Sequence, residues 1–176
     1  MKWPKATDHK LALTRRQILN SGLVLGCAAA FPGRLLADSG NPVDSGLATS
    51  DLIYLTPLQS GGQESRCQAE IWFVSDNVNV YVVTAKDAWR AKAVRKGLKQ
   101  ARIWVGDLGN WQSAKGRYRA LPMFEAVGNQ INDPNEHRRV LELFGSKYRM
   151  EWLVWGPRFR TGLNDGSRVM LQYTPA

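Results

Sequence analysis

The sequence predicts an α+β fold, an antiparallel β-barrel of about seven strands and two helices. Aliphatic and aromatic residues make up 44% of the 176 residues, enough to fill a core. Short segments rich in β-branched and aromatic residues recur between clusters of Gly, Pro, Asn and Asp, as strands and turns do. These segments do not alternate regularly with helices, which argues against a doubly wound parallel sheet.

The first 37 residues have the layout of a signal peptide. A basic opening leads to Arg15 and Arg16, and an apolar run over residues 23–31 follows that is too short to span a bilayer. The order Thr-Arg-Arg-Gln-Ile-Leu resembles the twin-arginine export signal. We therefore expect export to the periplasm by the twin-arginine machinery, cleavage near Ala37 and no transmembrane span, with ordinary export as the alternative. The twin-arginine route carries folded proteins, which is a first hint of a bound cofactor.

Cys27 offers another way to process this segment, because Val-Leu-Gly-Cys resembles a lipoprotein cleavage box and would give a lipid anchor. Cleavage near Ala37 would leave Cys67 as the only cysteine, so no intramolecular disulfide is expected. Residues 38–50 are rich in Gly, Ser and Pro and are expected to form a flexible linker. Residues 51–176 are expected to form one domain.

Charge and histidine content exclude several functions. The formal charge is +9, but residues 1–37 hold six Lys/Arg against one Asp, which leaves a domain with a net charge of +4. A domain this mildly basic is not expected to bind nucleic acid. Its only histidine is His137, so neither a zinc site nor any other metal site is expected, and His137 is expected to lie at the solvated surface.

Turn residues divide the domain into its elements. A first strand is predicted at residues 52–56, before Pro57, and residues 66–74 and 78–84 are predicted to pair as a hairpin. Asp87 can cap a basic helix, and a capping box at Asp133 begins a second helix that Gly145 ends. The remaining strands are predicted at 101–106, within 111–124, at 148–155 and at 167–173.

Thr84, Lys86 and Arg90 cluster where a predicted strand leads into the basic helix. A helix start presents free N–H groups and a positive dipole end to an anion. Arg90 offers a planar fork suited to a phosphate, and Lys86 adds a point charge. Arg66, on the preceding predicted strand, can project toward the same place. From charge alone, a solvated helix face without a ligand is the favoured interpretation.

The order of these motifs resembles the flavin-binding split barrel of the pyridoxamine 5′-phosphate oxidase-like superfamily, which includes deazaflavin-dependent reductases. The resemblance covers roughly residues 52–175. No single motif is as specific as a metal-ligand signature, so the weight lies in the ordered set. Its members are Arg66 followed by Trp-Phe-Val at 72–74, the strand ending in Thr84, the basic helix at 90–96 and the strand at 103–105.

The resemblance implies a homodimer that holds a cofactor in the groove between its subunits, with Arg158 and Arg160 in reach of the partner's site. Where the family often has Ser/Gly-Lys or Arg-Lys to bind the phosphate, this chain has Trp89-Arg90. The identity of the cofactor therefore stays open: FMN is expected first, with a deazaflavin and, less readily, haem as alternatives. The carried-over cofactor residues are Arg66, Thr84, Lys86, Arg90 and Lys92, with Trp89 covering the cofactor or packing as core.

The sequence therefore predicts an exported FMN- or deazaflavin-dependent oxidoreductase acting on a small-molecule substrate, with no side chain identified as an acid or base. The alternative is a non-catalytic cofactor- or ligand-binding split-barrel protein, haem being one such ligand. A polyanion-binding surface protein fits the basic helix but not the aromatic-rich strands.

Overall fold

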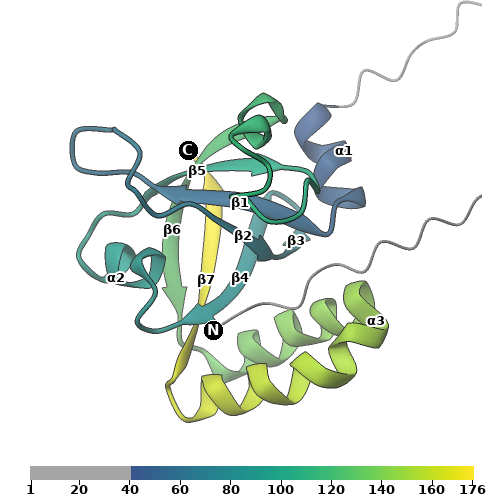
Figure 1. The fold of residues 1–176 in the computed structure, drawn as a ribbon. Coiled ribbons are helices and arrows are strands. Elements are labelled where there is room, and N and C mark those ends of the chain that lie inside the picture. The colour runs from purple at the N-terminus through teal and green to yellow at the C-terminus, as the bar shows by residue number, and fades with distance from the viewer. Residues whose placement is uncertain (1–40) are drawn as a thin grey trace, which may run out of the picture. The chain divides into compact units, whose positions relative to one another are not determined.

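The computed structural model describes residues 41–176, which form seven strands, three α-helices and one short 3₁₀ helix (Figure 1). The signal peptide predicted over residues 1–37 lies outside the described residues. In chain order the elements are α1 (Pro42–Thr49), β1 (Leu52–Pro57), β2 (Ala69–Trp72), β3 (Val74–Asp76), β4 (Asn79–Ala85), α2 (Trp89–Arg95), β5 (Gln100–Val105), η1 (Arg117–Ala120), β6 (Met123–Ile131), α3 (Pro134–Asn164) and β7 (Arg168–Pro175).

All seven strands belong to one antiparallel sheet with the order β2-β1-β5-β6-β7-β4-β3. The two edge strands, β2 and β3, are consecutive in the chain and are separated only by Phe73. The sheet must therefore curl until its edges meet, which makes a nearly closed barrel with its split between β2 and β3. The predicted α+β class and antiparallel split barrel are confirmed.

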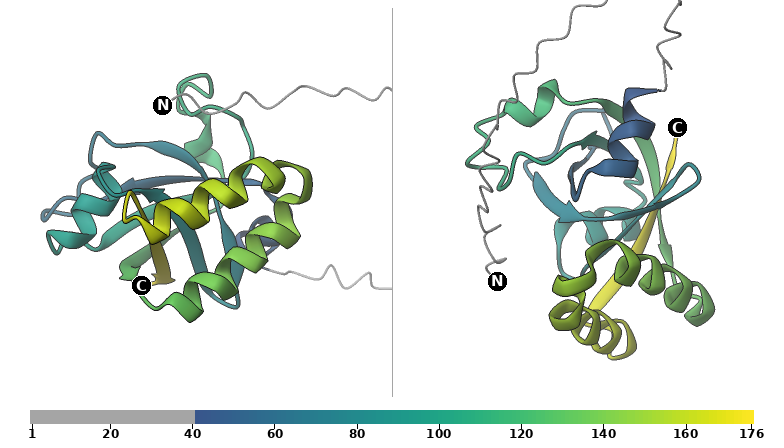
Figure 2. Two further views of the ribbon diagram at one scale, coloured as in Figure 1. Left: turned by 90° about the horizontal axis from the view of Figure 1, so that it is seen from below. Right: turned by 90° about the vertical axis from the view of Figure 1, so that its right-hand side faces the viewer.

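The barrel has an apolar interior and a second apolar layer outside it. Side chains alternate between the faces of a strand, and on β4 Val80 and Val82 point into the barrel core while Tyr81 and Val83 point outward. The outward residues pack against α3, which covers this side of the barrel (Figure 2). Both faces of β4 are thus buried, which explains its nearly continuous apolar sequence.

The predicted hairpin is only partly correct. Residues of β3 pair with β4 around Asn77, but β2 pairs with β1 at the opposite edge of the sheet. The chain changes edge at Phe73, whose N–H and carbonyl both contact the Tyr148 hydroxyl, at 2.9 and 2.8 Å, instead of a neighbouring strand. Arg66 lies in the loop before β2 and not on a strand.

The prediction of a strand at residues 148–155 is wrong, and so is the prediction that the second helix ends at Gly145. Helix α3 runs to Asn164 as two arms, residues 134–148 and 150–164, joined by a kink at Arg149 (φ 27°, ψ −90°) (Figure 2). Gly145 allows close packing of the arms, because a Cβ there would lie 3.0 Å from Nε1 of Trp152. The aromatic residues that suggested a strand pack on the barrel at helical spacing instead.

Two other segments differ from expectation. The predicted flexible linker contains α1, because Asn41 Oδ1 accepts a hydrogen bond from the N–H of Val43 (3.1 Å) and Leu47 is buried in the core. In the segment 111–124, only the last two residues join a strand, β6. Tyr118, the strand-like residue of that segment, instead stacks on Tyr54, with 4.8 Å between ring centroids.

No helix within residues 41–176 is long and apolar enough to cross a membrane.

Candidate functional site

A cavity of about 590 Å³ opens between α2 and the loop that joins β1 to β2. Its lining contains one cationic side chain, hydroxyl and amide groups, a thiol and an indole, and no carboxylate. The lining residues are Gln59, Ser60, Ser65, Arg66, Cys67, Trp89 and Leu98. Two of the predicted cofactor-binding residues, Arg66 and Trp89, therefore line one cavity.

Arg66 and Trp89 enter the cavity from different elements. Arg66 is exposed, and its guanidinium makes no hydrogen bond or ion pair with any residue in the part of the chain that the structure describes. Trp89 is the first residue of α2 and is half-buried, and Lys96 Nζ lies 5.6 Å from the centre of its ring. The cavity thus combines a cation with free donors and an aromatic surface.

Thr84 and Arg90 form a hydrogen-bonded pair at the junction of β4 and α2. Thr84 ends the interior-facing row of β4 and is only 2% exposed. Arg90 Nη1 donates to Thr84 Oγ1 at 2.6 Å, which directs this guanidinium toward the barrel end. The predicted strand–helix junction therefore exists, but one guanidinium donor of Arg90 is bonded to Thr84 and not free for a phosphate.

Two buried polar atoms here have no hydrogen-bond partner among the described residues: Nε of Arg90 itself and the hydroxyl of Tyr173. Burial raises the pKa of Tyr173, and the nearby positive charge of Arg90 acts in the opposite direction. Buried donors and acceptors are normally paired, so these two groups are exceptions within the barrel.

Lys86 and Lys92 lie apart from the cavity. Lys86 is exposed, and its charge contributes to the lowered pKa of Asp165, whose main cause is hydrogen bonding to Ser167. Lys92 Nζ lies 3.9 Å from Asp87 Oδ1. Asp87 does not cap α2, because Ala88 occupies the cap position and no side chain bonds there. The structure thus gathers Arg66 and Trp89 in one cavity and leaves Thr84, Arg90 and both lysines out of its lining.

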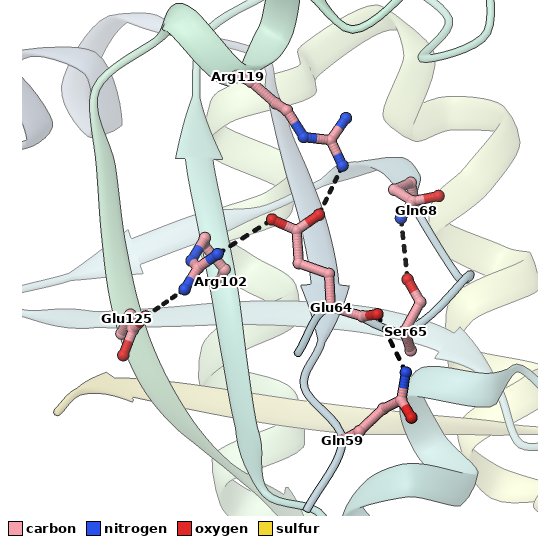
Figure 3. A network of polar contacts seen from close by, with 7 residues as sticks. All are labelled: Gln59, Glu64, Ser65, Gln68, Arg102, Arg119 and Glu125. Carbon is pink, nitrogen blue, oxygen red and sulfur yellow. Dashed lines mark hydrogen bonds and ion pairs between the residues drawn. The ribbon is translucent and has the colours of Figure 1, made fainter. Parts of the chain in front are cut away.

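The loop that supplies most of the lining is held by a network centred on Glu64 (Figure 3). Its carboxylate accepts from Arg102 Nη1 at 3.1 Å and from Arg119 Nη2 at 2.5 Å. Arg102 also donates to Glu125 at 2.6 Å, which ties the loop to β5 and β6. Within the loop, the Gln59 amide donates to the Glu64 carbonyl at 3.2 Å.

Sequence reasoning missed this network and the contribution of Cys67. The partners of Glu64 are 38 and 55 residues away in the chain, so no local pattern connects them. A weaker signal was present: the segment Gln-Glu-Ser-Arg-Cys-Gln at residues 63–68 is polar without being low in complexity, as a structured functional loop often is.

The described residues contain no group of three or more His, Cys, Asp or Glu side chains that could hold a metal ion. His137 is half-buried, with Nε2 2.9 Å from the carbonyl of Ile131, and it lies on α3 and not at this cavity.

No protein-family model and no curated protein matches this chain. Solved structures match it in fold. HutZ, the haem storage protein from Vibrio cholerae, is 16% identical with a TM-score of 0.53, over 76% of this chain and 87% of that one. The conserved hypothetical protein Rv2991 from Mycobacterium tuberculosis is 16% identical with a TM-score of 0.54, over 78% and 80%.

A Listeria innocua protein assigned to the pyridoxamine 5′-phosphate oxidases is also similar, with 15% identity, a TM-score of 0.49 and coverage of 76% of this chain and 90% of that one. The two likenesses with TM-scores above 0.5 establish the fold class, and the chain is a split-barrel protein. The resemblance predicted from the sequence is confirmed as a likeness of fold. At these identities the likeness extends to the fold and not to the ligand or the reaction.

Proposed function

We propose that the cavity beside α2 binds the phosphate and ring of a flavin-type cofactor, FMN or a deazaflavin, and that the protein is an exported oxidoreductase acting on a small molecule. The observation that supports this most is the unpaired Arg66 guanidinium, which shares a carboxylate-free cavity with the indole of Trp89. An anion-binding group and an aromatic surface in one cavity suit a ligand that is anionic at one end and aromatic at the other.

The lining fits such a ligand in size and in chemistry. A volume of about 590 Å³ lies within the roughly 300–1,000 Å³ typical of small-molecule sites. Arg66 has its full set of donors available for a phosphate, and Ser60, Ser65 and Gln59 add neutral donors. Trp89, steadied by Lys96 over its ring, offers a flat face to stack on.

Arg90 has a supporting role in this proposal. Its bond to Thr84 orients the guanidinium, and its charge adds to the positive potential at the barrel end. Its Nε is buried and has no hydrogen-bond partner among the described residues. The Thr84–Arg90 bond joins β4 to α2, and the Glu64 network holds the loop between β1 and β2. The proposed site is therefore built on ordered elements.

A bound flavin-type ring would supply hydride or electron transfer, and the residues of this chain would hold and orient it and exclude water. The flavin assignment itself is an analogy of fold. We also propose a homodimer in which Arg158 and Arg160 reach the partner's site. Support for self-association comes from α3, where Met150 and Leu153 expose 74% and 70% of their surface.

Non-catalytic haem binding is the alternative, supported by the fold likeness to a haem storage protein. In this cavity a haem iron would have the Cys67 thiol as a ligand, because His137 does not line it. Both functions agree with export by the twin-arginine route, which delivers proteins already folded around a cofactor.

Absorbance of protein purified from a host with a twin-arginine pathway separates the two functions. A flavin or deazaflavin band that is released on denaturation supports the oxidoreductase, and a Soret band supports haem binding. A colourless protein that takes up neither FMN nor haem on titration would refute both.

A titration with FMN and riboflavin tests the phosphate grip. Losing a charge-assisted hydrogen bond costs about 1.5–3 kcal/mol, so Arg66→Gln should weaken FMN binding by roughly 10- to 100-fold. The same variant should leave riboflavin binding nearly unchanged, because riboflavin lacks the phosphate. Lys92→Gln is the matched control, since it removes a cation outside the cavity and should change FMN binding less than two-fold.

A further inference from the structure

A second cavity, of about 480 Å³, lies between the two arms of α3. It shares no residue with the cavity beside α2, and Figure 1 shows α2 and α3 on different sides of the barrel. The first arm contributes Pro134, His137, Arg138, Leu141 and Glu142, and the second contributes Arg160, Leu163 and Asn164. The groove therefore has its own chemistry, independent of the proposed cofactor site.

The floor of the groove is apolar and its rim is cationic. Leu141 and Leu163, one from each arm, supply apolar surface, while Arg138 and Arg160 place one guanidinium on each arm. Arg138 uses one donor on Asn135 Oδ1 and keeps the others. Arg160 makes no hydrogen bond or ion pair with the described residues, its one contact being a cation–π approach to Trp152 at 5.8 Å.

The charges of the groove favour one type of ligand. Two arginines and Glu142 give a net charge of +1, and no ion pair within the described chain joins Glu142 to either arginine. His137 adds no charge when neutral, and its Nε2 must carry the proton because its neighbour at 2.9 Å, the Ile131 carbonyl, only accepts. A monoanion with an apolar body matches both the charge and the floor.

We propose that this groove is a binding site for an amphipathic monocarboxylate, with the carboxylate between Arg138 and Arg160 and the apolar chain along Leu141 and Leu163. The planar guanidinium pairs well with a carboxylate. The apolar contribution comes from removing the methylene groups of the ligand from water.

Octanoate is the first probe, measured by the chemical shifts of the Leu141 and Leu163 methyl groups in the full chain. Octan-1-ol tests the charge and acetate tests the apolar chain. We expect saturable shifts of these methyl groups and at least ten-fold tighter binding of octanoate than of either control. Equal binding of octanol, or no saturable shift at millimolar octanoate, would overturn the proposal.

Charge variants test which residues hold the carboxylate. Arg160→Gln and Arg138→Gln should each weaken octanoate binding at least five-fold. Glu142→Gln should tighten it, about two- to five-fold, because it removes the only negative charge from the rim. Arg158→Gln is the matched control on the same arm, since Arg158 lies over Trp155 at 4.9 Å and does not line the groove.

If Arg158→Gln weakened binding as much as Arg160→Gln, the effect would be general surface charge and the site would be refuted. Each variant's methyl spectrum without ligand shows whether the fold is intact. The FMN titration of Arg138→Gln and Glu142→Gln, neither of which has a part in the proposed cofactor site, should be unchanged, so a failure of this proposal and a failure of the cofactor proposal can be told apart.

Discussion

Tyr148 makes the contact on which the split of the barrel depends. Its hydroxyl accepts a hydrogen bond from the N–H of Phe73 at 2.9 Å and lies 2.8 Å from the carbonyls of both Phe73 and Asp51. Phe73 is the fully buried residue where the chain passes from β2 to β3. The hydroxyl satisfies the backbone groups of Phe73, which have no neighbouring strand to pair with, and so connects α3 to the barrel.

Replacing Tyr148 with Phe removes only the hydroxyl oxygen. The ring should keep its stacking on Trp72, with centroids 4.3 Å apart, so the packing is preserved. The buried N–H of Phe73 is left without a partner, at a cost of about 1–3 kcal/mol. With a loss of about 2 kcal/mol and an m-value of about 2 kcal/mol/M, the urea midpoint should fall by roughly 1 M.

Tyr173→Phe is the matched control. Tyr173 is also buried, but its hydroxyl has no hydrogen-bond partner among the described residues. Its removal should leave the urea midpoint of the ligand-free protein unchanged or slightly higher. Urea unfolding followed by tryptophan fluorescence measures both variants. A wild-type midpoint for Tyr148→Phe, or the same loss of stability in both variants, would refute the stabilising role of the Tyr148 hydroxyl.

Three further predictions concern packing, charge and the loop of the cavity. Gly156→Ala should lower the free energy of unfolding by about 1–3 kcal/mol, because the added Cβ would lie 2.8 Å from Trp152; thermal unfolding measures it, and an unchanged midpoint would contradict the packing. Burial lowers the pKa of Lys147 to about 8, so between about pH 8 and its unfolded value of 10.5 the unfolded state binds more protons and stability rises with pH. Lys147→Met should remove this rise in stability. Urea midpoints of the wild type and the variant, measured across this pH range, test the prediction, and the same pH dependence in both proteins would disprove it. Glu64→Gln should weaken FMN binding several-fold, because it loosens the loop that lines the cavity. Glu125→Gln keeps both ion pairs of Glu64 and should leave FMN binding unchanged. Equal effects of the two variants in the FMN titration would show that the Glu64 ion pairs do not support the site.

Local sequence signals correctly located the strands and the helix start that depend on neighbouring residues. The strands β1, β5 and β7 were predicted within a few residues, because their β-branched and aromatic residues are flanked by turn residues. The capping box at Asp133 also began a helix as predicted, with Asp133 Oδ1 accepting from the N–H of Asn135 at 2.9 Å. These features depend on residues a few positions apart, which a sequence displays directly.

The site was predictable only in part, for the same reason. The sequence indicated a strand–helix junction with Thr84 and Arg90, and these two do bond. It did not indicate that Arg90 turns inward or that Lys92 pairs with Asp87. Side-chain direction depends on which face of α2 meets the barrel, and seven residues of helix hold too little pattern to determine that.

By itself, the sequence determined that this protein is an antiparallel α+β barrel with a cationic junction after the strand predicted at residues 78–84. It did so because hydrophobic period and turn chemistry act over short distances along the chain. Only the tertiary structure decided that residues 148–155 are helical, that the sheet splits at Phe73, and that Arg66 shares a cavity with Trp89. Each of these depends on a contact between distant residues, and such contacts override local propensity when they bury more surface or satisfy a buried backbone group.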